Sequence, residues 1–255
     1  MDTPDDSHID AALEEVGSFV RRQGDGDYFV HHRERYRNDL ATVGGFHRGG
    51  EILEIGSVPC HLTAALRLLG YPVVGIDLAP ERCRPIIDRY GLALRHCDIE
   101  REPLPFADGA FRYVLFNEVF EHLRIDPLFT LSELNRVLAD DGVLMLTTPN
   151  LYAIQQIARF LSGRGFGDPL TEFAKLRAIG HMGHVREYSH REVRRFLAYS
   201  RFAVERVDFH HYYYPRTLRG ALAYVLFRVL PARFRSYQVV LARKAGPSPA
   251  LAPLR

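Results

Sequence analysis

The sequence lacks the features that mark secreted proteins and membrane proteins. Its three cysteines, Cys60, Cys83 and Cys97, form no CxxC pair and are odd in number. They therefore suggest no disulfide framework and fit a reducing compartment. No run of 18 or more apolar residues occurs, so no segment is predicted to span a membrane. The first ten residues, MDTPDDSHID, are acidic and polar, unlike a signal peptide. We expect a cytoplasmic protein.

The chain also lacks a strong excess of either charge. It has 33 Lys and Arg against 31 Asp and Glu, a net charge of +2, so its overall charge does not indicate a nucleic-acid-binding protein. Lysine is nearly absent and occurs only as Lys175 and Lys244. No basic and aromatic stripe indicates an RNA-binding appendage. We expect a small-molecule partner rather than nucleic acid, and nothing in the sequence predicts the oligomeric state.

Between residues 51 and 147, short apolar segments alternate regularly with helical ones. Strands are predicted at 51–55, 73–77, 93–97, 111–116 and 143–147, and helices at 62–70, 79–90 and 127–138. Continuously apolar strands that alternate with helices are typical of a parallel sheet covered on both faces. Right-handed crossovers then predict a doubly wound α/β fold.

The segments on either side divide the chain further. Two helices, at 8–23 and 28–43, are predicted before the first strand. The alternation stops after residue 150, and we expect an insertion over the functional edge of the sheet, with a helix at 151–161 and irregular loops. The predicted units are a helical N-terminal lid (1–45), a main domain (46–246, insertion 151–188) and a disordered tail (247–255).

The C-terminal part returns to regular structure. Ser189 and Glu192 form a capping-box pattern that begins a helix to Tyr199, and strands are predicted at 202–209 and 238–244. The basic, apolar segment 219–235 is predicted to pack on the sheet as a helix. The alternative is contact with a membrane surface.

Four sequence features follow successive predicted strands. In EILEIGSVPC (51–60), the strand ends in Glu54, and Gly56 permits a sharp turn that directs backbone amides towards a ligand. Asp77 ends the next strand about 20 residues later, where a carboxylate is placed to accept hydrogen bonds from ribose hydroxyls. In HCDIE (96–100), Asp98 is placed to accept from an adenine amino group and Ile99 to pack on the ring.

The fourth feature is LFNEVFEHL (115–123). There the strand is expected to give way to a helix that carries Glu118, Glu121 and His122.

In this order, the four features resemble those of class I S-adenosylmethionine-dependent methyltransferases. The resemblance covers residues 46–150, and the pattern at 189–244 fits the end of that fold. It implies a Rossmann-like, mostly parallel seven-stranded sheet with an antiparallel last strand, and S-adenosyl-L-methionine as cofactor. The HVREYS segment (184–189) resembles one found in small-molecule members, including those of glycan and natural-product pathways.

The resemblance also implies a cofactor site. Glu54 and Gly56 would contact the methionine part of the cofactor, and Asn117 would lie near its sulfonium. The full set of implied cofactor-binding residues is Glu54, Gly56, Ser57, Asp77, Leu78, Asp98, Ile99 and Asn117. Family members often carry further glycines where this chain has Val58 and Cys60. We therefore expect a different turn, with Pro59 fixing its backbone.

Methyl transfer needs an aligned acceptor and, in some enzymes, a base. Histidine is the natural base near neutral pH. His184 is the preferred candidate because it lies in the irregular insertion, followed by His122, with Glu118 nearby; His181 is another. A structural or solvated role is the alternative for each. The histidines at 181, 184, 210 and 211 match no recognised ligand spacing, so no metal site is predicted.

The segment YFVHHRERYR (28–37) is a candidate lid over the cofactor. Arg33 or Tyr36 is expected to reach the cofactor carboxylate. A solvated helix face is an equal alternative.

The predicted function is methyl transfer to an oxygen, nitrogen or carbon of a small molecule (a metabolite, sugar or natural product) in a biosynthetic pathway. One alternative is a non-methylating cyclase or accessory protein on the same scaffold, which Val58 and Cys60 keep open. The other is an NAD-dependent oxidoreductase. It ranks last because EIGSVPCHL does not supply GxGxxG.

Overall fold

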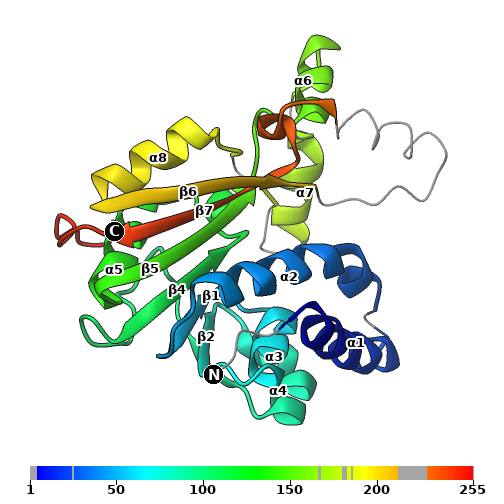
Figure 1. The fold of residues 1–255 in the computed structure, drawn as a ribbon. Coiled ribbons are helices and arrows are strands. Elements are labelled where there is room, and N and C mark those ends of the chain that lie inside the picture. The colour runs from blue at the N-terminus through cyan, green and yellow to red at the C-terminus, as the bar shows by residue number, and fades with distance from the viewer. Residues whose placement is uncertain are drawn as a thin grey trace.

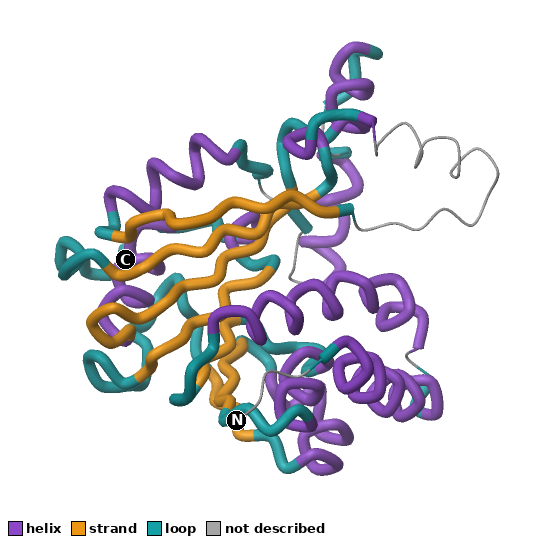
Figure 2. The backbone as a smooth tube through the Cα atoms, viewed as in Figure 1, coloured by secondary structure: helices purple, strands orange, loops and turns teal. Residues whose placement is uncertain are grey.

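A seven-stranded sheet forms the centre of the computed structural model, which describes residues 5–24, 26–165, 168–179, 183–184, 186–211 and 229–254 (Figures 1 and 2). The strands are β1 (Ile52–Ile55), β2 (Val73–Asp77), β3 (Ala93–His96), β4 (Phe111–Asn117), β5 (Leu138–Pro149), β6 (Phe202–His210) and β7 (Tyr237–Lys244). The helices are α1 (Asp6–Arg22), α2 (Gly26–Phe46), α3 (His61–Leu68), α4 (Arg84–Tyr90), α5 (Pro127–Val137), α6 (Ile154–Leu161), α7 (Pro169–Ile179) and α8 (His190–Tyr199).

The strand order is β3-β2-β1-β4-β5-β7-β6. Strands β1 to β5 pair in parallel, and β7 lies antiparallel between β5 and β6. The predicted Rossmann-like, mostly parallel sheet with an antiparallel last strand is therefore confirmed. The first two crossovers extend the sheet from β1 to β3, and the chain then returns to place β4 on the other side of β1.

Each face of the sheet has its own hydrophobic core. On β1, Ile52 packs into a cluster with residues of α1 to α4, whereas Leu53 packs into a second cluster with residues of α5 and α8. Successive side chains of a strand point to opposite faces, so a strand buried on both sides must be continuously apolar. This is why the short apolar runs of the sequence predicted β1, β2 and β4 to within one residue, whereas β5 begins five residues before the predicted 143–147.

The two N-terminal helices belong to the first of these clusters. On α1, the apolar residues with helical spacing are buried, as the sequence predicted: Ile9, Leu13, Val16 and Val20. Helix α2 lies along the same face (Figure 1). Its Asn38 amide donates to the Tyr237 hydroxyl at 3.0 Å, and this hydrogen bond links α2 to β7. Another side of α2 faces the carboxyl ends of β1 and β4, where it can line a site.

Two expectations about local structure are wrong. After β4 there is no full helix but a single 3-10 turn, Phe120–His122, because Glu118 has a φ of 56° and interrupts the regular backbone. In the region expected to be irregular, residues 169–179 form α7. The capping box is confirmed: the Glu192 backbone N–H donates to Ser189 Oγ, and the Ser189 N–H donates to the Glu192 carboxylate.

The remaining expectations concern the C-terminal part. Residues 219–228 of the basic, apolar segment lie outside the described residues. Within the described part, no helix has the length and apolar character needed to cross a bilayer. Residues 247–254 form neither helix nor strand, and the Ser248 backbone N–H donates to Asn135 Oδ1 at 3.0 Å.

Candidate active site

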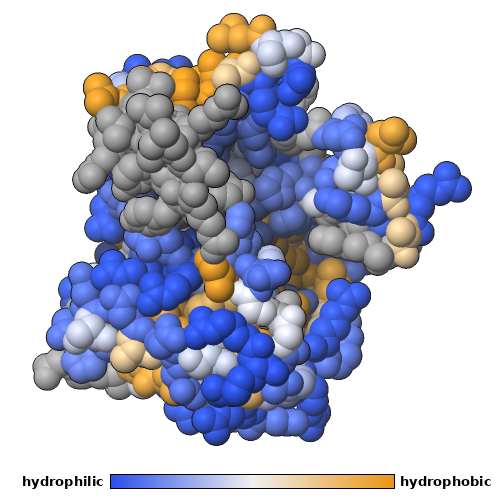
Figure 3. All heavy atoms as spheres, turned by 90° about the vertical axis from the view of Figure 1, so that its right-hand side faces the viewer, coloured by the Kyte–Doolittle hydropathy of each residue, from blue (hydrophilic) through white to orange (hydrophobic). Residues whose placement is uncertain are grey.

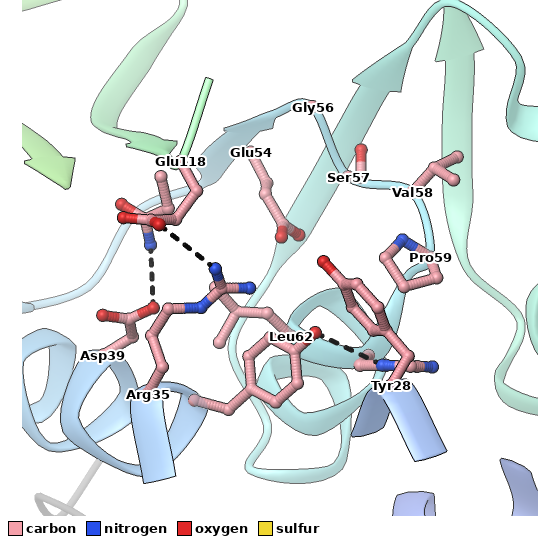
Figure 4. A pocket seen from close by; sticks show the side chains of 13 residues that line it. Tyr28, Arg35, Asp39, Glu54, Gly56, Ser57, Val58, Pro59, Leu62 and Glu118 are labelled. Carbon is pink, nitrogen blue, oxygen red and sulfur yellow. Dashed lines mark hydrogen bonds and ion pairs between the residues drawn. The ribbon is translucent and has the colours of Figure 1, made fainter. Parts of the chain in front are cut away.

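The candidate site lies where the order of the strands reverses. Connections from β1 and β4 leave in opposite directions, and such a switch point opens a crevice at the carboxyl ends of the two strands. A pocket occupies this position, with about 420 Å³ of empty space when its opening to solvent is included (Figure 4). It is lined by Tyr28, Arg35, Tyr36, Asp39, Glu54, Gly56, Ser57, Val58, Pro59, His61, Leu62, Asn117 and Glu118. The side of the molecule that lies on the right in Figure 1 is hollowed and mostly hydrophilic (Figure 3).

The loop after β1 forms one wall of the pocket. Gly56 has a φ of +71°, and the backbone N–H groups of Gly56 and Ser57 both donate to the Ile76 carbonyl, at 2.9 and 3.1 Å. A Cβ atom on Gly56 would lie 2.4 Å from Val119 Cγ2. The turn therefore requires glycine both for its backbone conformation and for the close approach of the segment after β4.

Replacing this glycine tests the turn. We expect Gly56→Ala to destabilise the fold by about 2–4 kcal/mol, because it combines left-handed strain with overpacking against Val119. Gly91→Ala is the matched control, since Gly91 has a φ of +60° and a Cβ atom added to it would meet nothing within 4 Å. It should lose only about 1–2 kcal/mol. Urea unfolding of both variants measures the difference, and equal losses would show that Val119 yields without cost.

The loop after β1 still forms a hydrogen-bonded turn, although Val58 and Cys60 stand where the family pattern often has glycine. The Val58 backbone N–H donates to Asp77 Oδ2 at 3.0 Å, and the Cys60 N–H donates to the Ser57 carbonyl. Cys60 is fully buried and has a φ of 65°, the left-handed conformation that glycine adopts most easily. The turn is therefore formed by a different set of residues, with Asp77 as its anchor.

Three buried acceptor atoms around the pocket receive no hydrogen bond from the described residues: Glu54 Oε2, Asp39 Oδ1 and Asn117 Oδ1. Leaving a buried acceptor unpaired costs about 1–3 kcal/mol. Desolvation, with the charge of Asp77, raises the pKa of Glu54 to about 8, and desolvation also raises the pKa of Asp39 well above its usual range. The arrangement fits a ligand that brings several donors, such as an ammonium group or hydroxyls.

Helix α2 forms the opposite wall. Arg35 points towards Glu118 of the β4 end, with 3.4 Å between its Nη1 and Glu118 Oε2 (Figure 4). Tyr36, one of the two residues expected to reach the cofactor carboxylate, also lines the pocket. Arg33 does not, because its guanidinium pairs with Asp10 of α1 at 3.2 Å. The sequence interpretation missed Arg35 and Asp39, which share one helical face with Tyr28 at positions i, i+7 and i+11.

The other implied cofactor residues lie further along the same sheet edge. Asp77 accepts from the backbone N–H groups of Val58 and Ala79. Leu78 is 57% exposed. Beyond β3, Asp98 Oδ1 accepts from the Glu100 N–H at 3.1 Å, and Ile99 is partly buried. None of these four predicted residues lines the pocket itself. They follow the ends of β2 and β3, along the same edge of the sheet as the pocket.

The three proposed catalytic residues converge beside the pocket, together with Glu121. Glu118 Oε1 accepts from the Thr147 hydroxyl at 3.1 Å. The rings of His122 and His184 lie 5.0 Å apart, centroid to centroid. Desolvation, reinforced by the charge of Glu118, raises the pKa of Glu121 well above its usual range.

The surroundings of His184 favour its protonated form. Desolvation alone would lower the pKa of His184, but the hydrogen bond to Glu187 and the charge of Glu121 raise it overall. His181, the other candidate, lies outside the described residues. The structure thus brings together residues from the end of β4 and from the segment before α8.

Comparisons with known proteins support the same assignment of fold. A family model described as a methyltransferase domain matches residues 29–230. Among curated proteins, none matches the chain significantly.

Three solved structures share the fold. An S-adenosylmethionine-dependent methyltransferase from Thermotoga maritima is 17% identical with a TM-score of 0.60, and the match covers 91% of this chain and 99% of that one. The Haloferax volcanii protein solved with the Trm112 methyltransferase activator is 16% identical with a TM-score of 0.59, and the match covers 92% of this chain and 98% of that one. An S-adenosylmethionine-dependent methyltransferase from Methanosarcina mazei is 17% identical with a TM-score of 0.56, and the match covers 80% of this chain and 96% of that one.

Proposed function

The chain belongs to the methyltransferase domain family and is an S-adenosylmethionine-dependent methyltransferase, and from this premise we propose that its acceptor is a small molecule. The bound cofactor supplies a methyl group on a positively charged sulfur. The protein's own task is therefore to hold the acceptor in line with that group and to exclude water.

We propose that the methionine part of the cofactor lies in the pocket between α2 and the ends of β1 and β4. The observation that supports this is a set of buried acceptor atoms on Glu54, Asp39 and Asn117 that receive no hydrogen bond within the described part of the chain and suit the ammonium group of the cofactor. Arg35 is a cation on the pocket wall and is placed for the carboxylate. Gly56 and Ser57 would border the same part.

The nucleoside part would then follow the sheet edge towards β3. We assign the ribose to Asp77 and Leu78 and the adenine to Asp98 and Ile99. Asp77 also holds Val58, so it would couple the shape of the loop to cofactor binding.

The acceptor would lie beside Glu118, His122 and His184. Glu118 lines the cofactor pocket, and its charge acts on both Glu121 and His184, so these side chains adjoin the pocket. The near-neutral net charge of +2 also favours a small-molecule acceptor over nucleic acid.

Titration calorimetry tests the cofactor assignment. We expect S-adenosylmethionine and S-adenosylhomocysteine to bind and NAD not to bind. Asp77→Ala should lower the affinity for the first two by at least about 10-fold, because two hydrogen bonds and the loop anchor are lost. Asp88→Ala, which removes an exposed carboxylate on α4, should bind as the wild type does. Unchanged binding by Asp77→Ala would refute the proposed ribose site.

The same preparation tests the acceptor class. Incubation with methyl-labelled S-adenosylmethionine and separated fractions of one cell extract should label the small-metabolite fraction. Label that appears only in the protein or RNA fraction would refute a small-molecule acceptor.

A further inference from the structure

Glu121, His122 and His184 each direct one potential ligand atom towards a common point, next to Glu118. All three atoms lie within 4.8 Å of one another. The Nε2 atoms of His122 and His184 are each 3.9 Å from Glu121 Oε1. This distance is too long for a hydrogen bond, so direct hydrogen bonds between these atoms do not account for the arrangement.

The other nitrogen of each ring is already turned to an acceptor. His122 Nδ1 lies 3.0 Å from the Gly183 carbonyl oxygen, and His184 Nδ1 lies 3.5 Å from Glu187 Oε1. A carbonyl and a carboxylate only accept, so the ring protons of the neutral histidines belong on Nδ1. Both Nε2 atoms then present lone pairs towards Glu121. Fixing the tautomer through an outer acceptor is the usual arrangement of a metal-binding histidine.

Glu121 is an equally well-oriented ligand. Its side chain is 0% exposed, and Oε2 accepts from the Thr148 hydroxyl at 2.8 Å. Oε1, the atom that faces the two histidines, accepts no hydrogen bond from the described residues. With both histidines in this tautomer, three potential ligand atoms face one another around a buried carboxylate. A metal ion that displaces the protons of Glu121 and His184 would satisfy all three atoms at once.

We propose that Glu121, His122 and His184 bind one divalent transition-metal ion, with Zn²⁺ as the best match to two imidazoles and one carboxylate. Ligands of one such ion lie about 3.4 Å apart, so the three atoms would approach one another slightly on loading. The proposal departs from the sequence prediction of no metal. Glu121 and His122 are adjacent in the chain, but His184 comes from a distant segment.

Three protein ligands leave at least one coordination position open, as in catalytic rather than structural zinc sites. The consequence for the acceptor rests on the proposed function. Glu118 lines the cofactor pocket and is close enough to the proposed metal site for its charge to act on Glu121 and His184. An acceptor hydroxyl in the open position would be acidified and lose its proton to water. Its oxygen would bond to the methyl carbon as the carbon–sulfur bond breaks, with the electron pair remaining on sulfur. We therefore infer a hydroxyl-bearing acceptor.

Metal titration of the full chain tests the site. After treatment with a chelator and dialysis, the protein is titrated with Zn²⁺ by calorimetry and with Co²⁺ by visible absorption. We expect one ion per chain. Glu121→Gln and His184→Gln should each weaken Zn²⁺ binding by at least about 100-fold, and Glu187→Gln by about 10-fold through the orientation of His184. His8→Gln, an exposed histidine on α1, is the matched control and should bind as the wild type does.

Binding of S-adenosylmethionine to the same samples separates the two proposals. Variants that still bind the cofactor but not the metal support the site. The absence of one-to-one Zn²⁺ binding by the wild type, or wild-type affinity in both Glu121→Gln and His184→Gln, would overturn it. Metal binding without cofactor binding would leave the site intact and refute the proposed cofactor pocket instead.

Discussion

Glu54→Gln is expected to weaken the binding of S-adenosylmethionine about 100-fold, since interactions between charged, buried partners contribute about 2–5 kcal/mol. Glu54 is only 4% exposed, and its Oε2 faces the pocket without a hydrogen bond from the described residues. Glutamine has nearly the same shape, so the loss would come from the charge that pairs with the cofactor ammonium. Titration calorimetry measures it directly.

The stability of the free protein supplies an independent readout. The folded-state pKa of Glu54 is about 8, above its usual value of 4.5, because burial disfavours the carboxylate. The protonated form is therefore the one that folding favours. Its contribution to stability is present below pH 4.5 and is lost as the pH rises through 8. The stability of Glu54→Gln should therefore fall less over this pH range. Part of the fall should remain, because the pKa of Glu121 is also raised.

Cofactor affinity should change with pH in the opposite sense. If the carboxylate of Glu54 holds the ammonium group, the affinity of the wild type should fall about 10-fold for each pH unit below 8. The variant should show a much flatter profile over this range.

A buried glutamate far from the pocket provides the control for Glu54→Gln. Glu133 accepts from the Leu104 backbone N–H and pairs with Arg136. Glu133→Gln should lower stability but leave cofactor affinity unchanged. A similar loss of affinity in both variants would indicate general damage to the fold and would contradict a specific role for Glu54.

The sequence predicted the parts of the site that follow strands. Glu54, Gly56, Asn117 and Glu118 could be placed because parallel strands end at one edge of the sheet, so the residues after β1 and β4 must meet there. Arg35 could not be placed in the same way. Its position depends on which side of α2 faces the sheet, and tertiary packing decides that.

Local backbone conformation was harder to predict. The sequence pattern after β4 suggested a helix, but Glu118 adopts a left-handed conformation and ends the strand in a short turn. At Cys60, a conformation typical of glycine is held by a buried non-glycine residue. Both residues contact or adjoin the pocket, and departures from local preference are expected to concentrate at such sites.

The cluster around Glu121 shows the limit of spacing rules. Recognised metal motifs place several ligands within a few residues, and here only Glu121 and His122 are neighbours. His184 joins them through a loop whose Gly183 carbonyl lies 3.0 Å from His122 Nδ1. A third ligand that arrives from a distant segment is visible only once the fold brings the segments together.

His184→Ala is expected to lower the methyl-transfer rate by about 10²–10⁴-fold and to leave the affinity for S-adenosylmethionine unchanged, since a group that acts on the acceptor contributes to the chemical step. The expectation holds whether His184 binds a metal ion or acts as a base. Single-turnover kinetics with the identified acceptor measure the rate, and calorimetry measures cofactor binding on the same samples.

His190→Ala is the matched control for this variant. His190 begins α8, and its ring lies 6.0 Å from that of Phe209 on β6, centroid to centroid. It should keep the wild-type rate. Wild-type turnover by a folded His184→Ala protein would remove His184 from the mechanism, and the acceptor would then have to be aligned by Glu118 and the wall of α2 alone.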